Sequence, residues 1–244
     1  MNKHVEYKRI VDGASVAVLL VHGILSTPNH FRKLIPLIPE EYSVYAMVTD
    51  GHCGSVSDFS HSSLKSWRKS VQSALDELLL THREVYMVGY SLGTLLSIEQ
   101  AINNPRISRI FCIALPIKVK FRLKMIDISA KIYFNRLGSD KYAHACKESY
   151  GTTDSKNIFK YFGWIPRFID LFKIIDETRR NLYRLKTPCV AFQSLCDELV
   201  SVESVGILQN ESEIEVHTLE KSTHFYYDDE DLEYLKNEFK KFLS

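Results

Sequence analysis

The sequence has little of several features that mark whole classes of proteins. Its 244 residues carry a formal net charge of only +1, from 31 basic and 30 acidic side chains. This balance argues against an overall nucleic-acid footprint and against a disordered chain, because both usually carry an excess of charge. Apolar residues make up 45% and charged residues 25% of the chain, as in an ordinary globular protein. Its length fits one large domain, or a core with a modest insertion.

Long apolar runs and paired cysteines are scarce too. The first eight residues contain no apolar stretch of the signal-peptide kind, and the longest charge-free run, residues 13–31, has too many polar residues to be predicted as a membrane span. The cysteines are scattered, with no Cys-x-x-Cys pair: Cys53, Cys112, Cys146, Cys189 and Cys196. This usage predicts reduced thiols in a cytoplasmic protein, and no metal site.

The balanced total hides a charge asymmetry along the chain. Residues 1–116 carry a net charge of +1, residues 117–186 a net charge of +9, and residues 187–244 a net charge of −9. A shift this sharp indicates that the middle segment differs in kind from its neighbours. The alternative is that these segments are merely solvated faces of opposite sign, as charge runs usually are.

Apolar runs and helical periodicities alternate along much of the chain. The predicted strands are continuous apolar or alternating runs at residues 16–21, 43–48, 85–89, 107–115, 189–193 and 213–219. The predicted helices have apolar residues at helical spacing and lie at 62–80, 91–103, 167–183, 201–209 and 228–243. This alternation predicts an α/β fold, with a mainly parallel central sheet flanked by helices on both faces.

The alternation is interrupted between Pro116 and Pro188. Residues 117–186 have a mostly helical pattern, rich in aromatic and basic residues. We therefore predict a core formed by residues 1–116 and 187–244, with residues 117–186 inserted as a helical segment after the fourth predicted strand. In an open parallel sheet, ligands bind outside the carboxyl ends of the strands, so the residues that follow each strand are the candidates for chemistry.

The third predicted strand ends in a Gly-x-Ser-x-Gly motif, Gly89-Tyr90-Ser91-Leu92-Gly93, and a predicted helix follows. In this context the serine stands on a tight strand-to-helix turn that exposes its hydroxyl, and the helix directs its amides and positive dipole end at the site. The motif predicts Ser91 as a nucleophile. The alternative is that these residues form a turn with a structural role only.

A serine hydroxyl is a weak nucleophile at neutral pH and needs a base. His224 follows the last predicted strand and so stands at the strand-end side of the sheet, whereas His217 lies within that strand. We predict His224 as the general base. A surface histidine with no role in catalysis is the alternative.

The imidazole in turn needs an acid that fixes its tautomer and stabilises its charge. Asp197 follows the strand at 189–193, and Glu198 is its close competitor. We predict Asp197 as the acid, with helix capping as its alternative role. The order Ser91, Asp197, His224 is the nucleophile–acid–base order expected for this fold.

Acyl transfer also needs two preorganised donors for the oxyanion. The backbone N–H of Leu92, directly after the nucleophile, is one candidate. The loop after the first strand supplies the other, because Gly23 permits a close approach and Ile24 follows it. His22 could instead be a metal ligand or a second base, but no ligand cluster surrounds it in the sequence.

These motifs resemble those of the α/β-hydrolase superfamily, and most closely its bacterial carboxylesterases and monoacylglycerol lipases. Besides the serine motif, the similar segments are the oxyanion loop His22-Gly23-Ile24, the acid motif Asp197-Glu198-Leu199-Val200 and the histidine loop at His224. Gly51-His52-Cys53-Gly54 is similar to a Gly-His-Gly loop of these enzymes, with Cys53 in place of the second glycine. The resemblance covers residues 16–225, excluding much of 117–186, where the related enzymes insert a cap.

The resemblance implies a serine hydrolase that cleaves carboxylic esters, such as short- to medium-chain acyl esters or monoacylglycerols, through an acyl-enzyme intermediate and without a cofactor. A thioesterase, amidase or peptidase with the same triad is an alternative, and a non-catalytic binding homologue is another. The expected partner is a small-molecule acyl ester. The apolar residues predicted to line an acyl pocket, or else to form a small core of the cap, are Phe159, Tyr161, Phe162, Trp164, Phe168 and Phe172.

Overall fold

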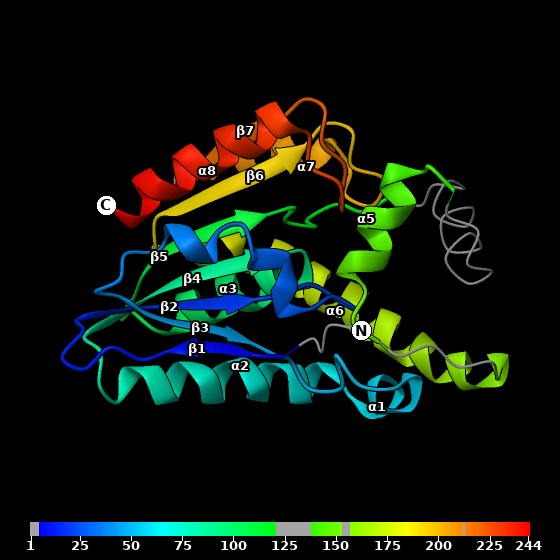
Figure 1. Cartoon of the computed structure of the whole chain (residues 1–244), viewed down its shortest axis with the longest axis horizontal. Helices are drawn as coiled ribbons and strands as arrows, with labels where there is room; N and C mark the ends of the chain where they lie inside the picture. Colours follow the sequence, from blue (N-terminus) through cyan, green and yellow to red (C-terminus); the bar gives the residue numbers. More distant parts are fainter. Residues whose placement is uncertain (1–4, 121–137, 153–156, 212) are drawn as a thin grey trace.

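A mainly parallel sheet runs through the centre of the molecule (Figure 1). The computed structural model describes residues 5–120, 138–152, 157–211 and 213–244, and the strands lie in the order β1-β3-β2-β4-β5-β6-β7. Among these described strands, β1 alone runs antiparallel to its neighbour. The strands are β1 (Tyr7–Arg9), β2 (Val16–Val21), β3 (Ser43–Met47), β4 (Glu84–Tyr90), β5 (Ile107–Ile113), β6 (Cys189–Ser194) and β7 (Ile214–Leu219).

Helices and short 3₁₀ segments surround the sheet. The α-helices are α1 (Val56–His61), α2 (Leu64–Leu79), α3 (Leu92–Asn103), α5 (Lys141–Ser149), α6 (Ile165–Asn181), α7 (Glu203–Gln209) and α8 (Asp229–Leu243). The 3₁₀ segments are η1 (Pro28–Phe31), η2 (Ile35–Leu37), η3 (Ile158–Trp164) and η4 (Leu182–Arg184). Serines cap the first two helices: Ser55 and Ser63 each accept a backbone N–H in a capping box, which satisfies amides that the first turn leaves free.

Strand β2 shows why the sheet is covered on both faces. All six of its residues are buried. Ala17, Leu19 and Val21 pack into the cluster that includes residues of α2, α3 and α6. Their alternate neighbours point the other way, into a second cluster built with residues of η1 and α8. Because successive side chains of a strand point to opposite faces, a continuous apolar run can be buried only if both faces are covered.

The predicted α/β architecture is confirmed, and each predicted strand and helix corresponds to an observed one within a few residues at its ends. The elements that the sequence did not predict are short. β1 has three residues and pairs with β3 at the edge of the sheet, and α1 has six. Such lengths show too few repeats for a periodic pattern to emerge.

Between β5 and β6 the described chain is helical, as predicted, and comprises α5, η3, α6 and η4. The second half of α6 packs against the body, and Ile174 and Ile175 join the cluster under α2 and α3. Residues 121–137 and 153–156 of the predicted insertion lie outside the described residues. A division into a core and a separate cap over residues 117–186 therefore stays a prediction.

Candidate active site

Ser91 stands on a sharp turn between β4 and α3. Its backbone has φ 51° and ψ −119°, a conformation that non-glycine residues rarely adopt. The Ser91 N–H donates to the carbonyl of Ile113 at 2.9 Å, which ties the turn to the neighbouring strand β5. A Cβ added to Gly93 would overlap the carbonyl oxygen of Val21, so the motif's second glycine allows α3 to lie against β2. The turn thus places Ser91 at the carboxyl end of β4 and at the amino end of α3.

The loop after β2 lies directly beside this serine. A Cβ added to Gly23 would come within 3.0 Å of the Cβ of Ser91, so only a glycine fits there without displacement. Ile24 follows Gly23 on the half-buried part of the loop, and Leu92, the first residue of α3, is buried. The two residues predicted to donate to the oxyanion therefore both lie on segments next to Ser91: Leu92 follows it in the chain, and Ile24 follows Gly23 on the loop that packs against it.

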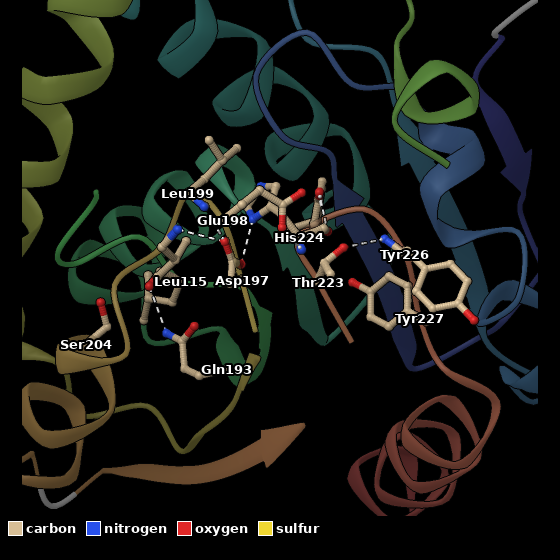
Figure 2. Close-up of polar contacts among 12 residues, drawn as sticks. Leu115, Gln193, Asp197, Glu198, Leu199, Ser204, Thr223, His224, Tyr226 and Tyr227 are labelled. Atoms are coloured by element: carbon tan, nitrogen blue, oxygen red, sulfur yellow. Dashed lines mark hydrogen bonds and ion pairs between the residues drawn. The ribbon is translucent and has the colours of Figure 1, made fainter. Parts of the chain in front are cut away.

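Asp197 and His224 meet in the interior, although 26 residues separate them in the sequence. The Nδ1–H of His224 donates to Oδ2 of Asp197 at 2.8 Å, while the backbone amides of Leu199 and Val200 donate to Oδ1, each at 2.7 Å (Figure 2). Asp197 is 1% and His224 3% exposed. Both oxygens of the carboxylate are thus held, one by the backbone that positions it and one by the imidazole.

Glu198, the predicted competitor for the acid role, contacts a different atom of the same histidine. Its Oε2 accepts the backbone N–H of His224 at 3.0 Å, and the side chain is buried (Figure 2). The two adjacent carboxylates therefore bind different parts of the same histidine: Asp197 binds its ring and Glu198 binds its main chain.

This arrangement changes the acidity of both partners. Burial lowers the pKa of His224, but the charge and hydrogen bond of Asp197 and the charge of Glu198 outweigh it, and the pKa lies above its ordinary value. Burial raises the pKa of Asp197, but His224 and the two loop amides outweigh that effect and hold it below its ordinary value. The pair is therefore arranged to stabilise an imidazolium beside a carboxylate.

Two residues outside the predicted set fix the loop that carries His224. Tyr90, next to the serine, donates its hydroxyl to the His224 carbonyl at 2.9 Å. Asp231, in the first turn of α8, accepts the amides of Lys221 at 2.8 Å and Ser222 at 2.7 Å, and the Ser222 hydroxyl at 2.7 Å. Nothing in the sequence marks either residue, because both depend on contacts between distant segments.

The contacts of His22 bear on its two alternative roles, as a metal ligand or as a second base. Its Nδ1–H donates to the Gly23 carbonyl at 2.8 Å, and its Nε2 accepts the amide of Thr49 at 3.1 Å. Burial, with a contribution from nearby His52, lowers the pKa of His22 to about 3. Both ring nitrogens are engaged with the backbone and the ring stays neutral, so His22 joins the loop after β2 to the loop after β3.

A further histidine, His30 of η1, lies close to the site. Its ring stacks on that of Tyr90, with centroids 3.4 Å apart, and its Nε2 is 3.4 Å from the hydroxyl oxygen of Tyr227. Burial and the neighbouring His224 and Arg32 lower the pKa of His30 to about 3. A neutral aromatic stack therefore packs against the loop of His224, and no sequence motif points to it.

The aromatic residues of the predicted insertion take two different positions. Trp164 is buried: its ring packs on Phe59, and its Nε1–H donates to the Val56 carbonyl at 3.1 Å. The phenylalanines predicted as pocket-lining are exposed at the surface: Phe159, Phe162, Phe168 and Phe172.

Two further observations apply to the described part of the chain alone. No group of three or more His, Cys, Asp or Glu side chains there is arranged to hold a metal ion. No helix there combines the length and the apolar character needed to cross a bilayer.

The sheet order, the serine turn and the buried Asp197–His224 pair can now be set beside those of known proteins. Residues 18–235 match the sequence model of the alpha/beta hydrolase family, and this span is most of the chain. The chain belongs to the alpha/beta hydrolase family. The match includes β4 with its serine turn as well as the segments that carry Asp197 and His224.

Individual relatives of this alpha/beta hydrolase are distant but extend over nearly its whole length. It is 24% identical to a thermostable monoacylglycerol lipase of Bacillus sp. (strain H-257), over 87% of this chain and 84% of the relative. It is also 24% identical to a carboxylesterase of Bacillus subtilis (strain 168), over 95% and 93% of the two chains. A solved structure from a study of the metagenome-derived lipolytic enzymes LipS and LipT has a TM-score of 0.75 and 22% identity, covering 99% of this chain and 98% of that one.

Proposed function

We propose that this alpha/beta hydrolase is a serine hydrolase that cleaves carboxylic esters, either short- to medium-chain acyl esters or monoacylglycerols. The observation that carries the proposal is the buried 2.8 Å hydrogen bond between Asp197 and His224, on a loop that Tyr90 joins to the Ser91 turn. Supporting it, the relatives named a lipase and a carboxylesterase match over more than four fifths of this chain.

In this proposal the reaction has two steps. Ser91 Oγ attacks the ester carbonyl while His224 takes its proton, and Asp197 stabilises the resulting imidazolium. The backbone N–H groups of Leu92 and Ile24 hold the oxyanion. The carbon–oxygen bond to the alcohol breaks, and His224 protonates the leaving alcohol. Water, deprotonated by the same histidine, then attacks the acyl carbon. The bond from that carbon to Ser91 Oγ breaks, His224 returns the proton to Oγ, and the acid is released.

We also propose that part of residues 117–186 acts as a cap beside this site. In support, the Gly151 N–H donates to the Leu25 carbonyl at 2.9 Å, so the segment contacts the loop that carries Ile24. Arg167 reaches the Ser60 carbonyl at 3.1 Å. The exposed phenylalanines of the segment are not part of this proposal, because their side chains face solvent.

Hydrolysis of p-nitrophenyl esters from acetate to laurate tests the proposal. We expect turnover that Ser91→Ala lowers by roughly 10⁴-fold or more. Ser97→Ala is the matched control, because it removes another buried hydroxyl, from α3, the helix that follows Ser91. That hydroxyl donates to the Gly93 carbonyl. A fluorophosphonate probe should label the parent chain and the control but not Ser91→Ala. Absence of Ser91-dependent turnover at every chain length would contradict the proposal.

A further inference from the structure

The outer surface of η3 and the first half of α6 is unusually apolar. Six large side chains there are 38% to 74% exposed and form what we call the η3–α6 patch: Phe159, Phe162, Ile165, Phe168, Ile169 and Phe172. The four members on α6 recur at intervals of three and four residues, so they share one face of the helix. Figure 1 shows this end of α6 projecting beyond the sheet, near α1.

The patch is not the face by which these elements attach to the body. Attachment uses the opposite side, where Trp164 and Arg167 donate to the carbonyls of Val56 and Ser60, and where Ile174 is fully buried. A helix on the surface of a globular protein normally has polar residues on its outer face. An outer face that is itself apolar marks a surface for a partner.

The charges around the patch indicate what kind of partner fits. Residues 157–186 hold seven basic and three acidic side chains. Each acidic one forms an ion pair: Asp170 with Arg167, Asp176 with Arg179 and Arg180, and Glu177 with Arg68 and Lys173. Lys160 and Lys173 are exposed and stand directly after Phe159 and Phe172, the first and last members of the patch in the sequence. The segment that carries the patch therefore has a net charge of +4.

We propose that the η3–α6 patch docks on an anionic lipid surface, with its phenylalanine and isoleucine side chains in the interfacial layer and the neighbouring basic side chains against the headgroups. Aromatic and aliphatic side chains beside lysines and arginines are what an interfacial helix needs, since burial of apolar area and attraction to anionic lipids add. A second copy of this chain fits less well, because two positively charged segments would repel each other. The proposal does not depend on the esterase chemistry.

Vesicle sedimentation tests the docking, with the full chain carrying Ser91→Ala so that no lipid is hydrolysed. The probes are vesicles of phosphatidylcholine alone and of phosphatidylcholine with an equal part of phosphatidylglycerol. We expect binding to the anionic vesicles that weakens as salt is added. Adding Ile165→Ser and Ile169→Ser should lower the apparent partition constant at least about tenfold, because two apolar anchors are lost. Tyr183→Ser is the control, since Tyr183 is 69% exposed but lies outside the patch.

A charge variant tests the proposed contact between the basic side chains and the lipid headgroups. We expect the parent chain to bind phosphatidylcholine vesicles only weakly, through its apolar side chains. Lys160→Glu with Lys173→Glu should weaken binding to the anionic vesicles and leave this weaker binding unchanged. With Ser91 intact, Ile165→Ser and Ile169→Ser should leave hydrolysis of soluble p-nitrophenyl acetate unchanged, which separates docking from catalysis.

Three outcomes would overturn the docking proposal. The first is no binding to anionic vesicles, or equal binding by the parent chain and the isoleucine variant. The second is a dimer in sedimentation velocity that the isoleucine substitutions dissociate, which would assign the patch to a second copy. The third is a fall of several degrees in the melting temperature of that variant, which would mean that the patch is covered within the chain itself.

Discussion

The loop of His224 and the η3–α6 patch are built in opposite ways. Around His224 the polar groups are buried and hydrogen-bonded: Asp197 binds the ring, and Glu198 binds the main chain. On the patch, apolar side chains face solvent, and the nearby acidic groups are paired within or beside α6. Charges act strongly where water is excluded and their partners are fixed, whereas a docking surface must leave its apolar area uncovered until a partner arrives. The difference separates the proposed catalytic site from the proposed docking surface.

The largest effect should come from the Asp197 ring contact. Asp197→Asn leaves the shape of the residue but removes the charge that stabilises the imidazolium, so kcat should fall by about 10³- to 10⁴-fold while the chain stays folded. Steady-state kinetics and circular dichroism on the same preparation measure both. Near-normal turnover would instead give the acid role to Glu198.

Substitution of Glu198 should affect catalysis less than substitution of Asp197, and it should act on the pH dependence of kcat/KM. The charge of Glu198, with the charge and hydrogen bond of Asp197, holds the pKa of His224 above its ordinary value, while burial acts in the opposite direction. Because the base must be neutral, kcat/KM should rise with pH through the His224 pKa. Glu198→Gln keeps an acceptor for the His224 N–H but removes the charge, so the rise should shift to lower pH.

The matched variant for this experiment is Glu198→Ala, which removes the acceptor as well as the charge. It should produce the same shift of the pH profile and lower kcat further, because the main chain of His224 loses its anchor. An unshifted profile in both variants would show that Glu198 supports the loop without affecting the base.

Asp231 links the fold to the site through hydrogen bonds alone. Asp231→Asn turns one of its oxygens into a donor that faces backbone N–H groups, so unfolding in urea should cost about 1–3 kcal/mol less than in the parent. Hydrogen bonds hold its pKa below the ordinary value against the effect of burial. The stabilisation that Asp231 provides is therefore present above the pKa of this residue in the unfolded chain. It is lost as the pH falls through the lower pKa of Asp231 in the folded chain. The difference between parent and variant should shrink in acid; a constant difference would contradict this account.

The smallest effect is expected on the patch, and two isoleucines of α6 allow a direct comparison. Ile169→Ala should change the free energy of unfolding by less than about 0.5 kcal/mol, because the side chain is already 62% exposed. Ile174→Ala, five residues along the same helix, should cost about 2–5 kcal/mol, because the side chain is fully buried. Equal losses in urea unfolding would remove the distinction between the two faces.

The sequence predicted those features that depend on local pattern. The run at 16–21 is uniformly apolar, which favours a strand covered on both faces, and the motif from Gly89 to Gly93 predicted the position of the serine turn. Tyr90, His30 and Asp231 could not be predicted, because their contacts join segments that are far apart in the chain. The exposure of the phenylalanines from Phe159 to Phe172 was equally hidden, because a helix that is apolar on two sides gives the same spacing whichever side is buried.

The hydrogen bonds that Asp231 accepts from the His224 loop have a consequence for when the site can form during synthesis. Asp231 follows Ser91 by more than half the length of the chain, and it orders the loop only once α8 has folded against the sheet. A nascent chain can therefore build β2, β4 and the serine turn on the ribosome while the histidine has no fixed position. The proposed site can therefore be completed only after the residues around Asp231 have left the exit tunnel.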